Sequence, residues 1–260
     1  MVLKGDLVVQ SFGFSSYLPI GKIDAVIEFF VNWDVDEIII LDIDATRTGS
    51  TIRLDLIERV SRKCFVPLTI GGGIRDSDFV TKLLKVGADK ICVNAVAIED
   101  PQFISRVADK YGRQFVTVSI DARKTASGYQ TFIRNGSVPT GLTPLEHALQ
   151  AEKNGAGEIF LNSIDRDGFR QGYDIELLKS VSQGVDLPVV ACGGVGKAGD
   201  LAEAITAGGC QAASAANIFN HTELSTVAGK AIMKRKGIPI RIDSGVKYED
   251  FEFDSLDRPI

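Results

Sequence analysis

The chain has 260 residues, of which 45% are hydrophobic and 24% charged, and its net charge is −5 from 29 basic and 34 acidic side chains. The apolar fraction excludes a disordered chain, and the lack of any run of 18 apolar residues excludes a membrane-spanning helix. The acidic balance argues against nucleic acid as the main partner. Because no basic segment followed by an apolar one opens the chain, we expect a cytoplasmic protein.

Short runs rich in Val and Ile alternate along the chain with stretches of helical length. The runs are apolar at successive positions rather than at alternate ones, which is typical of parallel strands buried on both faces. In chain order the expected strands cover residues 37–44, 66–70, 90–94, 115–121, 158–163, 187–192 and 212–216.

The helices between these strands have recognisable ends. Asp100-Pro101 and Thr143-Pro144 each place a capping side chain before a proline, which is typical of a helix start. Gly87, Gly155 and Gly208 each follow a helical stretch, where a left-handed C-cap is expected. Repeated strand–helix units of about 30 residues indicate an α/β fold.

The residues that mark strand starts and turns repeat along the chain at an offset of 121 residues. This offset places Glu37-Ile38 on Glu158-Ile159, Pro67 on Pro188, and Gly72-Gly73 on Gly193-Gly194. Two halves of four units predict a (β/α)8 TIM barrel built from two similar half-barrels, covering residues 1–240, with residues 241–260 as a C-terminal tail. A doubly wound sheet is the alternative, but it is not expected to repeat at half length.

Two glycine-rich turns follow strands at positions that the repeat relates. Glycines at a strand-to-helix turn let backbone N–H groups approach an anion, and the helix N-terminus adds partial positive charge. An asparagine ends the next strand in each half and would complete each cradle. The predicted phosphate-binding residues are Gly72, Gly73, Asn94, Gly193, Gly194 and Asn217. Turn geometry alone is the other interpretation of these glycines.

Acidic residues end three of the strands, where the chemistry of a barrel is expected. Asp42 and Asp44 follow the second strand, Asp121 the fifth, and Asp165 and Asp167 the sixth. A capping or ion-pairing role is the alternative, and it weighs most for Asp42 and Asp44. Asp121 directly ends its strand and is predicted to be a general acid or base.

Neither a metal nor an organic cofactor is expected. The four cysteines show no CxxC spacing and are predicted to be buried thiols, and the two histidines, His147 and His221, lie far apart in the sequence. No dinucleotide fingerprint and no P-loop is present.

The chain resembles the cyclase subunit (HisF-type) of imidazole glycerol phosphate synthase over residues 3–240. The stretches that carry the resemblance are LDIDAT, IGGGIRD, GADKICVN, VSIDARK, GAGEIFLNSIDRDG and ACGGVGK. It implies a barrel with two phosphate sites for a phosphorylated small-molecule ligand and two catalytic aspartates, on strands one and five. It also implies a glutaminase (HisH-type) subunit as partner in a heterodimer, whose ammonia passes through the barrel to the active face.

The resemblance carries over unevenly. It matches Asp121 to the fifth-strand catalytic aspartate, and Glu37, Lys90 and Glu158 to the charged ammonia gate at the bottom of the barrel. The arginine of that gate has no counterpart, and the first-strand aspartate falls on Val2. We therefore expect a truncated first strand and weakened catalysis.

Within the family, the stretches VDEIIILDIDAT and KCFVPLTIGGGI and a tail over residues 246–260 resemble a divergent branch encoded with surface-polysaccharide genes. Members of that branch pair with a glutaminase-like subunit and a sugar amidotransferase that converts an acetamido group to an acetamidino group. Three alternatives stay open: a true cyclase of histidine biosynthesis, a non-catalytic ammonia-channel scaffold, and a phosphoribosyl isomerase. The charged gate disfavours the isomerase, which needs no ammonia path.

Overall fold

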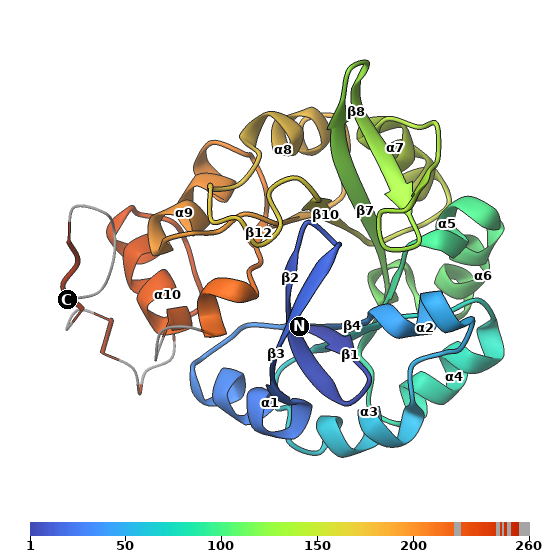
Figure 1. The fold of residues 1–260 in the computed structure, drawn as a ribbon, viewed down its shortest axis with the longest axis horizontal. Helices are drawn as coiled ribbons and strands as arrows, with labels where there is room; N and C mark the ends of the chain where they lie inside the picture. Colours follow the sequence, from blue (N-terminus) through green and yellow to red (C-terminus); the bar gives the residue numbers. More distant parts are fainter. Residues whose placement is uncertain (221–224, 243–244, 246, 249–250, 255–260) are drawn as a thin grey trace.

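The computed structural model describes residues 1–220, 225–242, 245, 247–248 and 251–254. Its centre is a curled sheet in which parallel strands run in the order β12-β11-β10-β7-β6-β5-β4-β1 (Figure 1). These strands are β1 (Val2–Lys4), β4 (Ile38–Asp42), β5 (Leu68–Gly71), β6 (Lys90–Val93), β7 (Val116–Thr125), β10 (Glu158–Ser163), β11 (Val189–Cys192) and β12 (Ala212–Ala213).

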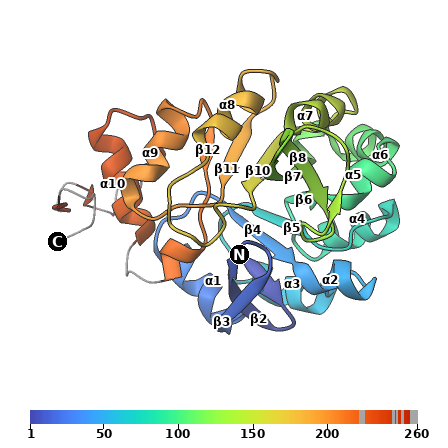
Figure 2. The same ribbon diagram turned by 45° about the horizontal axis from the view of Figure 1, so that its top comes forward.

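Helices alternate with the strands and cover the outside of the curled sheet (Figures 1 and 2). The longer ones are α1 (Ile23–Asn32), α3 (Leu54–Ser61), α4 (Ser77–Lys85), α6 (Gln102–Tyr111), α7 (Pro144–Lys153), α8 (Ile175–Ser182), α9 (Ala198–Thr206) and α10 (Ser225–Arg235). Shorter elements are α2 (Ile43–Thr48), α5 (Ala95–Glu99), η1 (Arg113–Phe115) and η2 (Asn217–Asn220). This alternation confirms the predicted α/β barrel class.

The strands are apolar at successive positions because both of their faces are covered. Ile40, Ile70, Val118 and Leu161 have no exposed surface and belong to one large core. Burying such side chains stabilises the fold by about 1.5–3 kcal/mol each. The hydrophobic core therefore surrounds the sheet and fixes the positions of the polar strand ends.

Two hairpins add antiparallel strands that the periodicity did not predict. β2 (Leu7–Phe12) and β3 (Ser16–Lys22) follow β1, and β8 (Gly128–Ile133) and β9 (Val138–Pro139) extend β7. The first hairpin lies beside the N-terminus near the middle of the ring (Figure 1). The β2–β3 hairpin therefore lies next to the strand ends where the catalytic residues are expected.

Most helix ends agree with the sequence patterns, but α6 has Pro101 rather than the predicted Asp100 as its N-cap residue, and one glycine differs. Thr143 and Glu146 form a capping box before α7, and α6 starts after Pro101. Gly87 and Gly155 have the expected positive φ, of +102° and +93°. The prediction for Gly208 was wrong, because Gly209 adopts the positive φ instead. Gly208 is needed for space, since a Cβ there would lie 2.6 Å from the carbonyl oxygen of Ala204.

The described part of the predicted tail packs against α10 and the end of α1. Tyr248 is 2% exposed and contacts a small cluster that includes Val227 and Ala231. Its hydroxyl donates to the buried carboxylate of Asp34, which also accepts from Lys230 at 2.9 Å. Within the described ranges, no helix has the length and hydropathy to span a membrane.

Candidate active site

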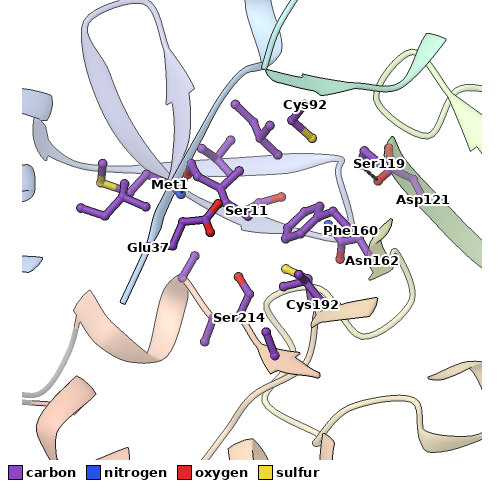
Figure 3. Close-up of a pocket in the computed structure, with 18 of the residues that line it drawn as sticks. Met1, Ser11, Glu37, Cys92, Ser119, Asp121, Phe160, Asn162, Cys192 and Ser214 are labelled. Carbon is purple, nitrogen blue, oxygen red and sulfur yellow. Dashed lines mark hydrogen bonds between the residues drawn. The ribbon is translucent and has the colours of Figure 1, made fainter. Parts of the chain in front are cut away.

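One cavity of about 1170 Å³ is lined by the inner face of the curled sheet and also by residues of α10 and the segment that follows it. Glu37 and Glu158 line it at the side where β4 and β10 begin, and Asn94 and Asp121 line it where β6 and β7 carry polar residues toward the opposite side. Figure 3 shows Glu37, Phe160 and Asp121 pointing into this common space. The cavity therefore connects the predicted gate with the predicted catalytic aspartate.

Asp121 lies on β7 and is 7% exposed. Its carboxylate accepts hydrogen bonds from Ser119 Oγ and Asn94 Nδ2, each at 3.2 Å. Burial is the main cause that raises the pKa of Asp121 to about 7. The hydrogen bond from Ser119 lowers this pKa, and the negative charge of Asp167 raises it further. A carboxyl group that exchanges protons near neutral pH can act as a general acid or base.

The strand register shows which residue occupies the position opposite Asp121. Asp121 pairs with Asn162 on β10, and Val2 pairs with Leu41 on β4. Because Leu41 and Asn162 are related by the 121-residue repeat, Val2 is the half-barrel equivalent of Asp121. An isopropyl group therefore stands where the repeat would place a second carboxylate.

The acidic residues near β1 and β4 have other partners. Asp42 accepts from the backbone N–H groups of Asp44 and Ala45 and so caps α2, as the alternative interpretation proposed. Asp44 forms an ion pair with Arg47 at 3.0 Å, and exposed Asp6 forms one with Arg53 at 2.8 Å. Neither Asp6 nor Asp44 is among the described residues that line the cavity.

The three predicted gate residues meet at the other end of the cavity. Lys90 Nζ lies 2.8 Å from Glu37 Oε2 and 3.3 Å from Glu158 Oε2. Buried threonines fix the carboxylates, because Thr69 Oγ1 donates to Glu37 at 2.5 Å and Thr117 Oγ1 donates to Glu158 at 2.9 Å. Burial alone would lower the pKa of Lys90, but the hydrogen bond with Glu37 and the charge of Glu158 outweigh it and raise the pKa.

The first glycine turn follows β5. Gly72 and Gly73 have φ of +125° and +66°, and a Cβ on them would lie 2.7 Å from the carbonyl oxygen of Asp42 and 2.1 Å from that of Ser50. The turn therefore needs glycine for its conformation and for close packing. Phosphate binding at this turn stays a prediction.

The second glycine turn follows β11 and repeats this geometry. A Cβ on Gly193 would lie 2.7 Å from the carbonyl oxygen of Ser163, the repeat partner of Asp42, and one on Gly194 would lie 2.2 Å from that of Gly172. The carboxylate of Asp200 accepts from the N–H of Gly196 at 2.8 Å. The two turns are thus equivalent in structure as well as in sequence.

The two asparagines predicted to bind phosphate are hydrogen-bonded within the protein. Asn94 Nδ2 donates to Asp121 and to the carbonyl oxygen of Ser119. Asn217 Nδ2 donates to the carbonyl oxygen of Ser11 at 2.8 Å and so joins η2 to β2. Sequence analysis missed this role of Asn217, because the partners are 206 residues apart.

No cluster of three or more His, Cys, Asp or Glu side chains suited to a metal ion occurs in the part of the chain that the structure describes. Cys92 and Cys192 line the cavity, and burial raises the pKa of each thiol, of Cys192 to about 12. Both are therefore neutral thiols near neutral pH.

Comparison with known proteins agrees with this geometry. Residues 2–225 match the family described as "Histidine biosynthesis protein". The chain is 51% identical over 260 residues, covering 100% of itself and 95% of the relative, to the "Putative imidazole glycerol phosphate synthase subunit hisF2" of Vibrio vulnificus. It is 44% identical to an "Imidazole glycerol phosphate synthase subunit HisF" of Dehalococcoides mccartyi (80% of this chain, 83% of the relative). A Clostridium botulinum protein of the same name is 40% identical (90% and 94%). The chain therefore belongs to the histidine biosynthesis protein family and is of the HisF type.

Proposed function

We propose that this chain is a synthase subunit that accepts ammonia from a glutaminase subunit at the gate and delivers it to the barrel mouth. The observation that carries the proposal is the continuous cavity between the Glu37–Lys90–Glu158 cluster and Asp121. A barrel interior is usually filled by layers of side chains. A cavity through it with an ion-paired entrance fits the passage of a small neutral molecule.

The lining of the cavity suits ammonia rather than ammonium. Between its ends lie Ile39, Cys92 and Phe160, which offer no charge to a cation. An ammonium ion would lose its hydration there without compensation, which is costly in an apolar interior. The Lys90 ammonium group at the entrance disfavours entry of other cations.

We further propose that the ammonia serves the conversion of an acetamido to an acetamidino sugar in surface-polysaccharide biosynthesis, with a sugar amidotransferase as a further partner. The support is Val2 at the position equivalent to Asp121. Ring closure of the histidine-pathway substrate needs proton transfer on opposite sides of that substrate, and delivery of ammonia does not. The glycine turns would hold a phosphorylated ligand at the mouth.

Histidine biosynthesis is the second candidate function, and the names of the relatives favour it. The two candidates differ in what Val2 implies. If the loss of the opposing carboxylate is what separates this chain from a cyclase, Val2→Asp should raise ammonium-dependent turnover of the histidine-pathway ribonucleotide. A true cyclase that uses another group instead of that aspartate would gain nothing from Val2→Asp.

The test of ammonia transfer uses the full chain co-expressed with the glutaminase-like subunit of the same operon. We expect the two to co-purify, and Lys90→Ala to uncouple glutamine hydrolysis from consumption of ammonia. Exposed Lys85, at the end of α4, provides the matched control, and Lys85→Ala should leave coupling intact. Failure of the subunits to bind, or full coupling in Lys90→Ala, would contradict the proposal.

A further inference from the structure

A second carboxylate faces the cavity beside Asp121. Asp167 lies in the loop after β10, the strand that pairs with β7, and lines the same cavity. Its Oδ2 accepts from Ser11 Oγ at 2.5 Å and from the N–H of Phe14 at 3.4 Å. The carboxylate also responds to the N–H of Gly13, and the side chain stays in contact with the cavity.

The two carboxylates influence each other electrostatically. Neither forms an ion pair in the part of the chain that the structure describes, and the titratable groups that act on them or respond to them are Tyr17, Cys92 and Cys192. Burial raises the pKa of Asp167 as it does that of Asp121. Two partly desolvated carboxylates that act on each other favour a state with one shared negative charge.

We propose that Asp121 and Asp167 act as the proton-transfer pair of this mouth, with Asp167 in the role that the residue on β1 cannot fill. The inference rests on the proposed function in one respect, that ammonia is the nucleophile, and it goes beyond delivery by placing C–N bond formation at this mouth. The lone pair of ammonia forms a C–N bond to an sp² carbon, and the π electrons move to the heteroatom. The carboxylic acid of Asp121 protonates that heteroatom, and the carboxylate of Asp167 takes a proton from the new ammonium nitrogen. Asp121 thus loses one proton to the heteroatom and Asp167 gains one from the nitrogen, and proton exchange with solvent restores both.

The placement of this pair restricts the chemistry it can serve. Asp121 comes from β7 and Asp167 from the loop after the neighbouring strand β10, and so both approach a ligand from one side of the mouth. Val2 lies on β1, on the other side of the sheet order. A same-side pair fits addition of ammonia to one exposed carbon rather than closure of a ring held between two opposed groups.

Asp167 also helps to hold the β2–β3 hairpin over the mouth, but contacts other than those of its carboxylate hold the hairpin as well. The N–H of Gly13 donates to the carbonyl oxygen of Asp167 at 2.9 Å, and Asn217 donates to that of Ser11. The rings of Phe12 and Phe169 meet edge to face with centroids 6.5 Å apart. These contacts remain in Asp167→Asn, so the charge can be removed with the hairpin in place.

The test is a pH titration of the aspartate carboxyl carbons by ¹³C NMR in the labelled full-length protein. It compares wild type with Asp167→Asn, Asp165→Asn and Ser11→Ala. Asp165 is an exposed aspartate in the same loop, outside the cavity, and is the matched charge control. Ser11→Ala loosens the hairpin without removing a charge. Since no substrate or glutaminase is present, the result does not depend on the proposed function.

We expect the titration midpoint of Asp121, about 7 in wild type, to fall in Asp167→Asn and to stay unchanged in Asp165→Asn. In Ser11→Ala the midpoint should fall much less than in Asp167→Asn, because Asp167 keeps its carboxylate. An unchanged midpoint in Asp167→Asn would overturn the inference. An equal fall in Asp165→Asn or in Ser11→Ala would also overturn it, because the effect would then come from general charge or from a loosened hairpin.

Discussion

Replacement of Lys90 by alanine should destabilise the barrel as well as uncouple ammonia transfer. The change removes the only cation that contacts Glu37 and Glu158 among the described residues. The two carboxylates would keep their hydrogen bonds from Thr69 and Thr117 and would stay in place. The variant therefore leaves two like charges facing a common space without compensation.

The size of the effect follows from the contacts. Hydrogen bonds to charged groups contribute about 1.5–3 kcal/mol each when well buried. The side chains of Lys90, Glu37 and Glu158 are 23%, 27% and 17% exposed, so solvent screens part of this. We expect a loss of about 3 kcal/mol in the free energy of unfolding, which lowers the Tm by roughly 6–12 °C for a domain of this size.

The pH dependence provides an internal check. The pKa of Lys90 is raised in the folded state, so its contribution is complete below its unfolded pKa of about 10.4 and is lost only as pH rises through the folded pKa. Thermal unfolding followed by circular dichroism from pH 7 to 11, with Lys85→Ala as control, should show a Tm deficit of Lys90→Ala that stays constant below about pH 10. A Tm equal to that of wild type, or a deficit that disappears already below about pH 9, would refute the reasoning.

Four further outcomes are expected. Inorganic phosphate should shift the amide NMR signals of Gly73 and Gly194, and the absence of any shift at high phosphate would contradict the predicted cradles. Gly73→Ala should cost at least about 1–3 kcal/mol in unfolding free energy, since its φ is positive and its Cβ would meet a carbonyl oxygen. Tyr248→Phe should cost about 1 kcal/mol by removing the hydrogen bond to Asp34, as urea unfolding can measure. Burial lowers the pKa of His147 to about 4, so wild type should lose roughly 3 kcal/mol as pH falls from 6.5 toward 4, and His147→Leu should lack that loss.

Much of the fold could be predicted because its main signals are local. Strands covered on both faces are apolar at successive positions, as Ile38–Asp42 and Leu68–Gly71 are. The repeat was visible because the glycines after β5 and β11 are required by the same backbone contacts. The β2–β3 hairpin was not predicted, because its position depends on contacts with Asp167, 156 residues away from Ser11.

The sequence predicted which residues belong to the candidate site, but it did not predict which of them contact one another. The resemblance matched Glu37, Lys90 and Glu158 to a gate, and the structure brings the three together. The neighbourhood of Asp121 and Asp167 depends on the pairing of β7 with β10 and on a loop conformation, which no spacing in the sequence encodes. Burial, which sets the pKa of Asp121, is likewise a property of the assembled ring.

The most direct test of the account measures the turnover of the histidine-pathway ribonucleotide by the isolated chain with ammonium salt as nitrogen donor. Loss of the substrate's absorbance reports turnover without a glutaminase. Because Val2 supplies no carboxylate opposite Asp121, we predict a rate on the order of 100- to 10,000-fold below that of an authentic cyclase in the same assay. Turnover equal to that of the authentic cyclase, and abolished by Asp121→Asn, would contradict the account and assign the chain to histidine biosynthesis.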